Sequence, residues 1–186
     1  IKFHPSSLGK LMTGEGKPIA KSVTCKKELI KIFLHLHYGR KRVDLKNNYL
    51  SKGNIVEKES ISIYNIINGT NYIKNEETLT NDYFIGTPDV KADIVLEAKS
   101  NWDLDTHWDA ITDGIEPAHE WQTHGYMDLT GIKKARLFYA LCNTPYTIIQ
   151  DEKKKLAWQM GCIEDETEEY IKICQQIEIN HIFDMA

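Results

Sequence analysis

The sequence predicts an α/β protein, because segments with the pattern of buried strands alternate with segments that have a helical pattern. Residues 93–99 form a short apolar run between polar residues, which is typical of a buried strand. Residues 135–142 are almost continuously apolar, which predicts a strand buried on both faces. Three longer segments are predicted to be helices: 22–38, which is amphipathic, 52–67 and 117–129.

The 186 residues match the size of one ordinary domain, so we predict a single domain over residues 1–186. With 41% hydrophobic and 27% charged residues, the composition is neither that of a disordered chain nor that of a membrane protein. No apolar run approaches the roughly 18 residues that a membrane span needs. There is no basic segment followed by an apolar one, so we expect a cytoplasmic protein without a secretory signal.

Positive charge is concentrated in the first third of the chain. The net charge is −4, but residues 1–60 contain 13 Lys and Arg against 5 Asp and Glu, whereas residues 61–186 contain 10 against 22. Affinity for a polyphosphate depends on where the positive charge lies, so this distribution favours a nucleic-acid partner. Solvated helix faces that are rich in lysine are the alternative explanation.

The first elements are predicted to be two helices. Residues 5–13 predict a short helix with Ser6 or Ser7 at its N-terminus. The first turn of this helix could bind a phosphate, or the serine could only cap the helix. Residues 22–38 predict a long amphipathic helix. Its apolar side is supplied by Val23, Leu29, Ile30, Phe33, Leu34 and Leu36. The basic cluster after this helix is well placed to contact a phosphate backbone and consists of Arg40, Lys41 and Arg42.

The predicted helix over residues 52–67 contains Glu57 four residues after a glycine. The spacing of apolar residues in this helix does not decide whether Glu57 faces solvent or lies near an active site. The residues expected to contact the core are Ile55, Ile63, Ile66 and Ile67. Asn68-Gly69 then predicts a turn, followed by a weak strand near Tyr72-Ile73.

Residues 83–100 contain the strongest chemical pattern. The proline before Asp89 favours an extended backbone at the start of this segment. Glu97 and Lys99 lie two residues apart, so they share one face of the predicted strand. These three side chains converge if the two segments pair as a hairpin. Two carboxylates and an ammonium group are costly to gather unless a divalent cation and a reacting anion bind there, which indicates a metal-dependent phosphodiesterase site. Asp93 is a second acidic candidate, because on a strand it would share the face of Glu97.

Gln122 and Tyr126 lie four residues apart, so they share a helix face. There they could bind a nucleotide, hold the lysine or brace the helix against the sheet. Trp102 and Trp108 could stack on nucleobases or pack beside the sheet. The remaining helices are predicted over residues 106–112, 117–129, 151–160 and 164–179.

Pro88-Asp89, followed after seven residues by Glu97-Ala98-Lys99, resembles the PD-(D/E)XK nuclease signature. Gly53…Glu57 is similar to the upstream acidic motif of the RecB and phage-exonuclease branch. Gln122…Tyr126 resembles the QxxxY motif of that branch and would support the site. Together with the start at Ser6-Ser7-Leu8-Gly9-Lys10-Leu11, the set resembles the YqaJ-like and phage lambda-type exonucleases of viral recombination over residues 5–145.

This resemblance implies a restriction-endonuclease-like core, in which helices flank a mixed sheet of four to five strands. It implies that Asp89 and Glu97 hold Mg²⁺, for which Mn²⁺ can substitute, with Glu57 and the Ala98 carbonyl as further ligands. Lys99 would orient or help deprotonate the attacking water and offset charge on the phosphate.

The implied substrate is linear duplex DNA with free ends, digested 5′ to 3′ in a bacterial or phage-infected cell. Ser7 and Thr87 are candidate contacts to the terminal phosphate. The implied partners are a single-strand annealing protein and further copies of the chain, a trimer by analogy; no membrane partner is expected.

Some RecB-type nucleases hold an iron–sulfur cluster with one early and three late cysteines. The four cysteines of this chain are Cys25, Cys142, Cys162 and Cys174. They form no CxxC pair and lack the tight late group that such a cluster needs, so we expect reduced thiols and no iron–sulfur cluster.

Two nuclease alternatives would use the same chemistry: a PD-(D/E)XK endonuclease and a CRISPR-associated RecB-like nuclease. A non-cutting DNA-binding module on a nuclease fold is an alternative of another class, although the intact Asp89, Glu97 and Lys99 argue against it. An unrelated globular binding protein with a chance motif is the last alternative.

Overall fold

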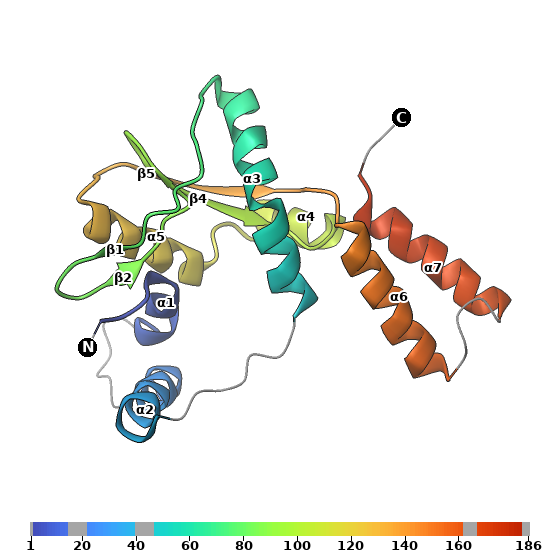
Figure 1. The fold of residues 1–186 in the computed structure, drawn as a ribbon, viewed down its shortest axis with the longest axis horizontal. Helices are drawn as coiled ribbons and strands as arrows, with labels where there is room; N and C mark the ends of the chain where they lie inside the picture. The colour runs from blue at the N-terminus through green and yellow to red at the C-terminus, as the bar shows by residue number, and fades with distance from the viewer. Residues whose placement is uncertain (1, 15–21, 40–46, 162–166, 184–186) are drawn as a thin grey trace. The chain divides into compact units, whose positions relative to one another are not determined.

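The computed structural model describes residues 2–14, 22–39, 47–161 and 167–183 and shows an α/β chain in which helices flank a small mixed sheet (Figure 1). The chain divides into two compact units, each built from three separate stretches. Unit 1 comprises residues 1–45, 73–97 and 115–137. Unit 2 comprises residues 46–72, 98–114 and 138–186.

The strands of the described residues form two sheets. In one, β1 (Leu79–Thr80) pairs antiparallel with β2 (Ile85–Gly86); the order in the other is β3 (Val90–Lys91), β4 (Val95–Ser100), β5 (Ala135–Ala140). The antiparallel pairing of β3 with β4 confirms the predicted hairpin.

The larger sheet is mixed, as predicted. The amide of Val95 donates to the carbonyl of Lys134 (2.9 Å), and the amide of Asn101 donates to the carbonyl of Ala140 (2.9 Å). Both partners advance by the same number of residues, so β4 and β5 run parallel. The described strands are split between two sheets rather than joined in one. β5 is largely half-buried, so the prediction that both its faces are buried was wrong.

Unit 1 contains a 3₁₀ turn, η1 (Pro5–Ser7), and the helices α1 (Leu8–Leu11), α2 (Val23–Tyr38) and α5 (Pro117–Thr130). The predicted helix over residues 5–13 is therefore a 3₁₀ turn that continues into one short α-helix. Glycines let these elements approach α5 closely. A Cβ at Gly9 would lie 2.5 Å from Cα of Ala118, and one at Gly125 would lie 2.6 Å from Cδ1 of Leu8.

Helix α2 has the predicted ends. The hydroxyl of Ser22 accepts a hydrogen bond from the amide of Cys25 (3.1 Å), and Gly39 ends the helix with φ 63°. The apolar side predicted for α2 does not face the core: its residues are 36–64% exposed, whereas Cys25 is buried. Helix α2 packs against α1, and Cys25 is its buried residue.

Unit 2 contains α3 (Asn48–Asn68), α4 (Leu104–Thr112), α6 (Tyr146–Met160) and α7 (Glu168–His181); α6 and α7 lie side by side (Figure 1). Two of these helices begin earlier than predicted because a side chain caps them. The side chain of Asn47 accepts from the amide of Tyr49 (2.9 Å), and that of Asp103 accepts from the amide of Thr106 (2.9 Å).

The buried face of α3 is partly polar. It consists of Asn48, Lys52, Val56, Ser60, Ile61 and Tyr64. Ile55, Ile66 and Ile67 are 58%, 82% and 67% exposed, so the prediction that they contact the core was wrong. Of the predicted set, Ile63 packs against a cluster of Val56, Ala140 and Cys142.

The strand predicted near Tyr72-Ile73 is not formed. Asn65 instead holds this segment: its Nδ2 donates to the carbonyl of Tyr72 (2.8 Å), and its Oδ1 accepts from the amide of Tyr72 (2.9 Å). The described cysteines, Cys25, Cys142 and Cys174, are buried free thiols. None of the described helices is long and apolar enough to cross a membrane.

Candidate functional site

The β3–β4 hairpin brings two of the predicted site carboxylates together. Val90 pairs with Leu96, so continuing the antiparallel register by one residue sets Asp89 opposite Glu97. Opposed residues project from the same face, with Cα atoms about 4.5–5.5 Å apart. Glu97 is 1% exposed and Asp89 is half-buried, so the pair lies at a largely desolvated edge of the hairpin.

Asp93 lies in the three-residue connection between these strands and is exposed. The amide of Ala92 donates to the carbonyl of Ile94 (3.0 Å) and closes the turn. The prediction that Asp93 shares a strand face with Glu97 was wrong, because the strand begins only at Val95. The register therefore favours Asp89 over Asp93 as the partner of Glu97.

Helix α5 orients the carboxylate of Glu97. Nε2 of Gln122 donates a hydrogen bond to Oε1 of Glu97 at 2.6 Å. Gln122 is 9% exposed. An ionised carboxylate can only accept, so the amide nitrogen must face it. Of the alternatives left open for Gln122, the structure shows a brace between helix and sheet, and its contact is the candidate ligand Glu97.

Tyr126 lies one turn after Gln122 and is buried, so the two residues share the inner face of α5 as predicted. Its ring lies against β2. A Cβ at Gly86 would be 3.0 Å from Cε1 of Tyr126, so the absence of a side chain at Gly86 admits the ring. Tyr126 thus packs the helix that carries Gln122 against β2 within unit 1.

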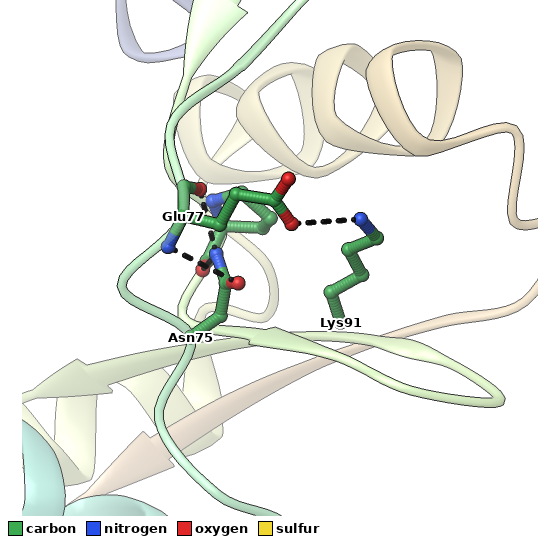
Figure 2. A network of polar contacts seen from close by, with 4 residues as sticks. Asn75, Glu77 and Lys91 are labelled. Atoms are coloured by element: carbon green, nitrogen blue, oxygen red, sulfur yellow. Dashed lines mark hydrogen bonds and ion pairs between the residues drawn. The ribbon is translucent and has the colours of Figure 1, made fainter.

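Asn75 is a site residue that sequence reasoning missed. Its amide donates to the carbonyl of Asp89 (2.7 Å), and its Nδ2 donates to the carbonyls of Pro88 (3.1 Å) and Glu77 (3.0 Å). Figure 2 shows the contact between Asn75 and Glu77 and the ion pair between Glu77 Oε2 and Lys91 Nζ (3.1 Å). Asparagine often forms such turn contacts, but nothing in the sequence links it to a carbonyl so far along the chain.

The other predicted catalytic and metal-binding residues belong to unit 2. Ala98 and Lys99 follow Glu97 in β4; Ala98 is buried, Lys99 is half-buried, and strand alternation sets Lys99 on the face of Glu97. Glu57 is half-buried near the middle of α3. The roles of Glu57, Ala98 and Lys99 stay predictions.

The candidate phosphate contacts are only partly described. Ser7 occupies the N-cap position of α1, but its hydroxyl donates to the carbonyl of His4 (2.7 Å) and does not cap the helix. Oγ1 of Thr87 lies 2.9 Å from Oγ1 of Thr78. The predicted basic cluster of Arg40, Lys41 and Arg42 lies outside the described residues.

The donor chemistry of the hairpin fits the divalent cation that the resemblance implies. In the part of the chain that the structure describes, no three His, Cys, Asp or Glu side chains gather as metal ligands. Mg²⁺ does not require three, since it is usually held by one or two carboxylates together with substrate phosphate. Asp89 and Glu97 offer carboxylate oxygens, the donor type that suits Mg²⁺ or Mn²⁺.

Lys52 anchors the segment that follows β4. It is 1% exposed, its Nζ donates to the carbonyl of Trp102 (2.8 Å), and it faces the rings of Trp102 and Phe183. Burial lowers the pKa of Lys52 to about 8. Trp102 packs against Tyr49 (ring centroids 4.3 Å apart), whereas Trp108 is 62% exposed. Sequence reasoning missed Lys52, which looks like an ordinary surface lysine.

The sequence matches no protein-family model and no curated protein. Its structure is similar to a crystal structure of a phage-related exonuclease from Haemophilus somnus 129PT, with 25% sequence identity, a TM-score of 0.69 and coverage of 80% of this chain and 71% of that one. This chain has an exonuclease fold.

The alkaline exonuclease LHK-Exo from Laribacter hongkongensis shares this fold. Its crystal structure is 16% identical, with a TM-score of 0.61, and the alignment covers 96% of this chain and 92% of that one. LHK-Exo in complex with dAMP gives 17% identity and a TM-score of 0.59 over the same coverage. At these identities the likeness to LHK-Exo concerns the fold alone.

Proposed function

We propose that this protein is a metal-dependent DNA exonuclease that hydrolyses phosphodiester bonds of linear duplex DNA from 5′ to 3′. The observation that carries the proposal is the register of the β3–β4 hairpin, which pairs Val90, the residue after Asp89, with Leu96, the residue before Glu97, together with the hydrogen bond from Gln122 to Glu97. The fold shared with a phage-related exonuclease supports it. The corresponding setting is phage-type recombination or DNA processing in the cytoplasm of a bacterial or phage-infected cell.

Each residue of the PD-(D/E)XK pattern has a role in this proposal. Asp89 and Glu97 hold the divalent cation, with the Ala98 carbonyl and Glu57 as further ligands. When bound, that cation would polarise the phosphodiester and make a nucleophile available near neutral pH. The ammonium group of Lys99 orients the attacking water and offsets negative charge that develops on the phosphate.

The proposed substrate class rests on two supports. LHK-Exo forms a complex with dAMP, a deoxynucleotide, which supports DNA as the substrate of this fold. The excess of Lys and Arg in residues 1–60 supplies positive charge for a polyanion. A single-strand annealing protein is the proposed partner, because digestion of one strand exposes the other.

The test compares linear and closed-circular duplex DNA, each with Mg²⁺ and with EDTA, and measures release of nucleotides. We expect release only from linear DNA with Mg²⁺, and from a 5′-labelled end first. Cutting of the closed circle would indicate an endonuclease, and undiminished activity in EDTA would exclude the metal site. Binding of DNA without any release would indicate a non-cutting module.

Substitutions test whether Asp89 and Lys99 have the proposed catalytic roles. Asp89→Asn and Lys99→Ala should abolish nucleotide release while the circular dichroism spectrum stays that of the wild type. The matched control is Asp93→Asn, because Asp93 lies nearby in the same hairpin but is exposed in its turn. Loss of activity in Asp93→Asn with activity retained in Asp89→Asn would reverse the assignment of the ligand.

A further inference from the structure

Asn75 contacts both peptide groups that flank Asp89. Its backbone amide donates to the carbonyl of Asp89 (2.7 Å), and its Nδ2 donates to the carbonyl of Pro88 (3.1 Å). The first of these carbonyls follows the Cα of Asp89 and the second precedes it. Because a planar peptide group moves as a unit, holding both groups fixes the two backbone torsions of Asp89 and the direction in which its side chain leaves the backbone.

The strand ladder does not fix Asp89 in this way. Strand β3 has two residues, Val90 and Lys91, and its pairing with β4 begins at Val90. Asp89 lies just before this strand, where the chain bends. Glu97, by contrast, lies inside the six residues of β4, and its carboxylate accepts a hydrogen bond from Gln122. The contacts with Asn75 therefore supply the backbone order at Asp89 that a longer strand would give.

Asn75 is itself held in place. Its Nδ2 also donates to the carbonyl of Glu77 (3.0 Å), and its Oδ1 accepts from the amide of Glu77 (3.3 Å). The carboxylate of Glu77 pairs with Nζ of Lys91 (3.1 Å), two residues after Asp89 (Figure 2). These contacts close a ring that starts at Asp89 and returns to the same segment at Lys91.

The contacts of the Asn75 side chain require an amide. An asparagine side chain carries two N–H donors and one acceptor oxygen, and the contacts with Pro88 and Glu77 use all three groups. An ionised aspartate has the same shape but no donor, so it would face both carbonyls with lone pairs alone. Asn75→Asp therefore removes these contacts with little change in side-chain size.

We propose that Asn75 is a positioning residue of the candidate metal site, which fixes the backbone of Asp89 and thereby orients its carboxylate as a metal ligand. Asn75 acts through Asp89 and does not bind the cation itself. The inference rests on the proposed function, in which Asp89 is a ligand of the divalent cation.

Calorimetric titration of the full chain with Mn²⁺, in the absence of DNA, tests the proposal without relying on activity. Asn75→Asp should raise the dissociation constant of Mn²⁺ about 10- to 100-fold, the usual cost of losing a residue that orients a ligand. An added negative charge by itself attracts a cation, so it cannot produce weaker binding. The matched control is Asn71→Asp at an exposed position four residues earlier, which should bind Mn²⁺ as the wild type does.

A double-mutant cycle with Asp89→Asn separates positioning from a general loss of stability. Asp89→Asn alone should weaken Mn²⁺ binding. In that background Asn75→Asp should change the dissociation constant less than about twofold, because the carboxylate that Asn75 orients is already gone. An effect as large as in the wild-type background would overturn the proposal.

A second variant, Asn75→Ala, removes the same side-chain contacts without placing a charge against the carbonyls, so it serves if Asn75→Asp does not fold. It should also weaken Mn²⁺ binding, and thermal unfolding without metal checks that it is folded. Unchanged Mn²⁺ binding in the folded Asn75 variants, with weaker binding in Asp89→Asn, would overturn the role of Asn75 and leave the proposed function standing. Unchanged binding in Asp89→Asn would overturn the assignment of Asp89 as a ligand, and with it both proposals.

Discussion

Replacing Gln122 with leucine tests whether helix α5 orients the site carboxylate. The substitution keeps a side chain of similar size but removes the donor that lies 2.6 Å from Oε1 of Glu97. A hydrogen bond to a charged group contributes about 1.5–3 kcal/mol, and at a carboxylate that is 1% exposed water replaces the lost donor poorly. We therefore expect the free energy of unfolding to fall by about 1.5–3 kcal/mol.

The assay is a double-mutant cycle of Gln122→Leu and Glu97→Leu, followed by urea unfolding. The two changes should couple by about 1.5–3 kcal/mol, because each single variant already removes the hydrogen bond that the pair shares. Nucleotide release by Gln122→Leu should fall about 10- to 100-fold, the usual cost of losing a residue that orients a ligand. Gln159→Leu, an exposed position in α6, is the control. A coupling below about 0.5 kcal/mol would refute the reasoning.

Two further predictions concern packing and pH. Gly125→Ala should lower the free energy of unfolding by about 1–3 kcal/mol, because its Cβ would meet Cδ1 of Leu8 at 2.6 Å. A Cβ at Gly53 would meet no atom within 4 Å, so Gly53→Ala should raise the free energy of unfolding by about 0.5–1 kcal/mol. Thermal unfolding that shows the same effect for both variants would contradict this packing argument. Lys52 has a pKa of about 8 when folded and 10.5 as its ordinary value, so between these values the folded state has released a proton that the unfolded chain still holds. Lys52 therefore makes stability rise with pH across that window, and urea titrations below pH 8 and near pH 10 should show that Lys52→Met removes this rise.

The parts of the fold that could be predicted are those with local signals. Ser22 and Gly39 mark the ends of α2, and Pro117 marks the start of α5, because caps and turns act over only a few residues. Helical spacing shows which residues share a face but not which face has a neighbour. That limit explains why the apolar side chains of α2 are exposed and why the buried face of α3 is partly polar.

In the candidate site, too, the local features could be predicted from the sequence and the long-range contacts could not. The spacing of Asp89 and Glu97 along a hairpin was enough to place them opposite each other, since strand register is nearly local. The partners that hold them could not be predicted, because Gln122 lies 25 residues from Glu97 and Asn75 contacts the carbonyl of Asp89. Such long-range hydrogen bonds depend on how helix and sheet pack.

The interleaving of the two units along the chain has a consequence for protein synthesis. Unit 1 needs residues from 1–45 and from 115–137, so its first stretch must wait until about 90 further residues have left the ribosome. At roughly 5–20 residues per second this delay is about 5–20 s. During that time the apolar side chains of the first stretch lack their partners, which makes the nascent chain a candidate for chaperone binding. For the same reason, no single cut in the gene yields a fragment that contains one whole unit without residues of the other.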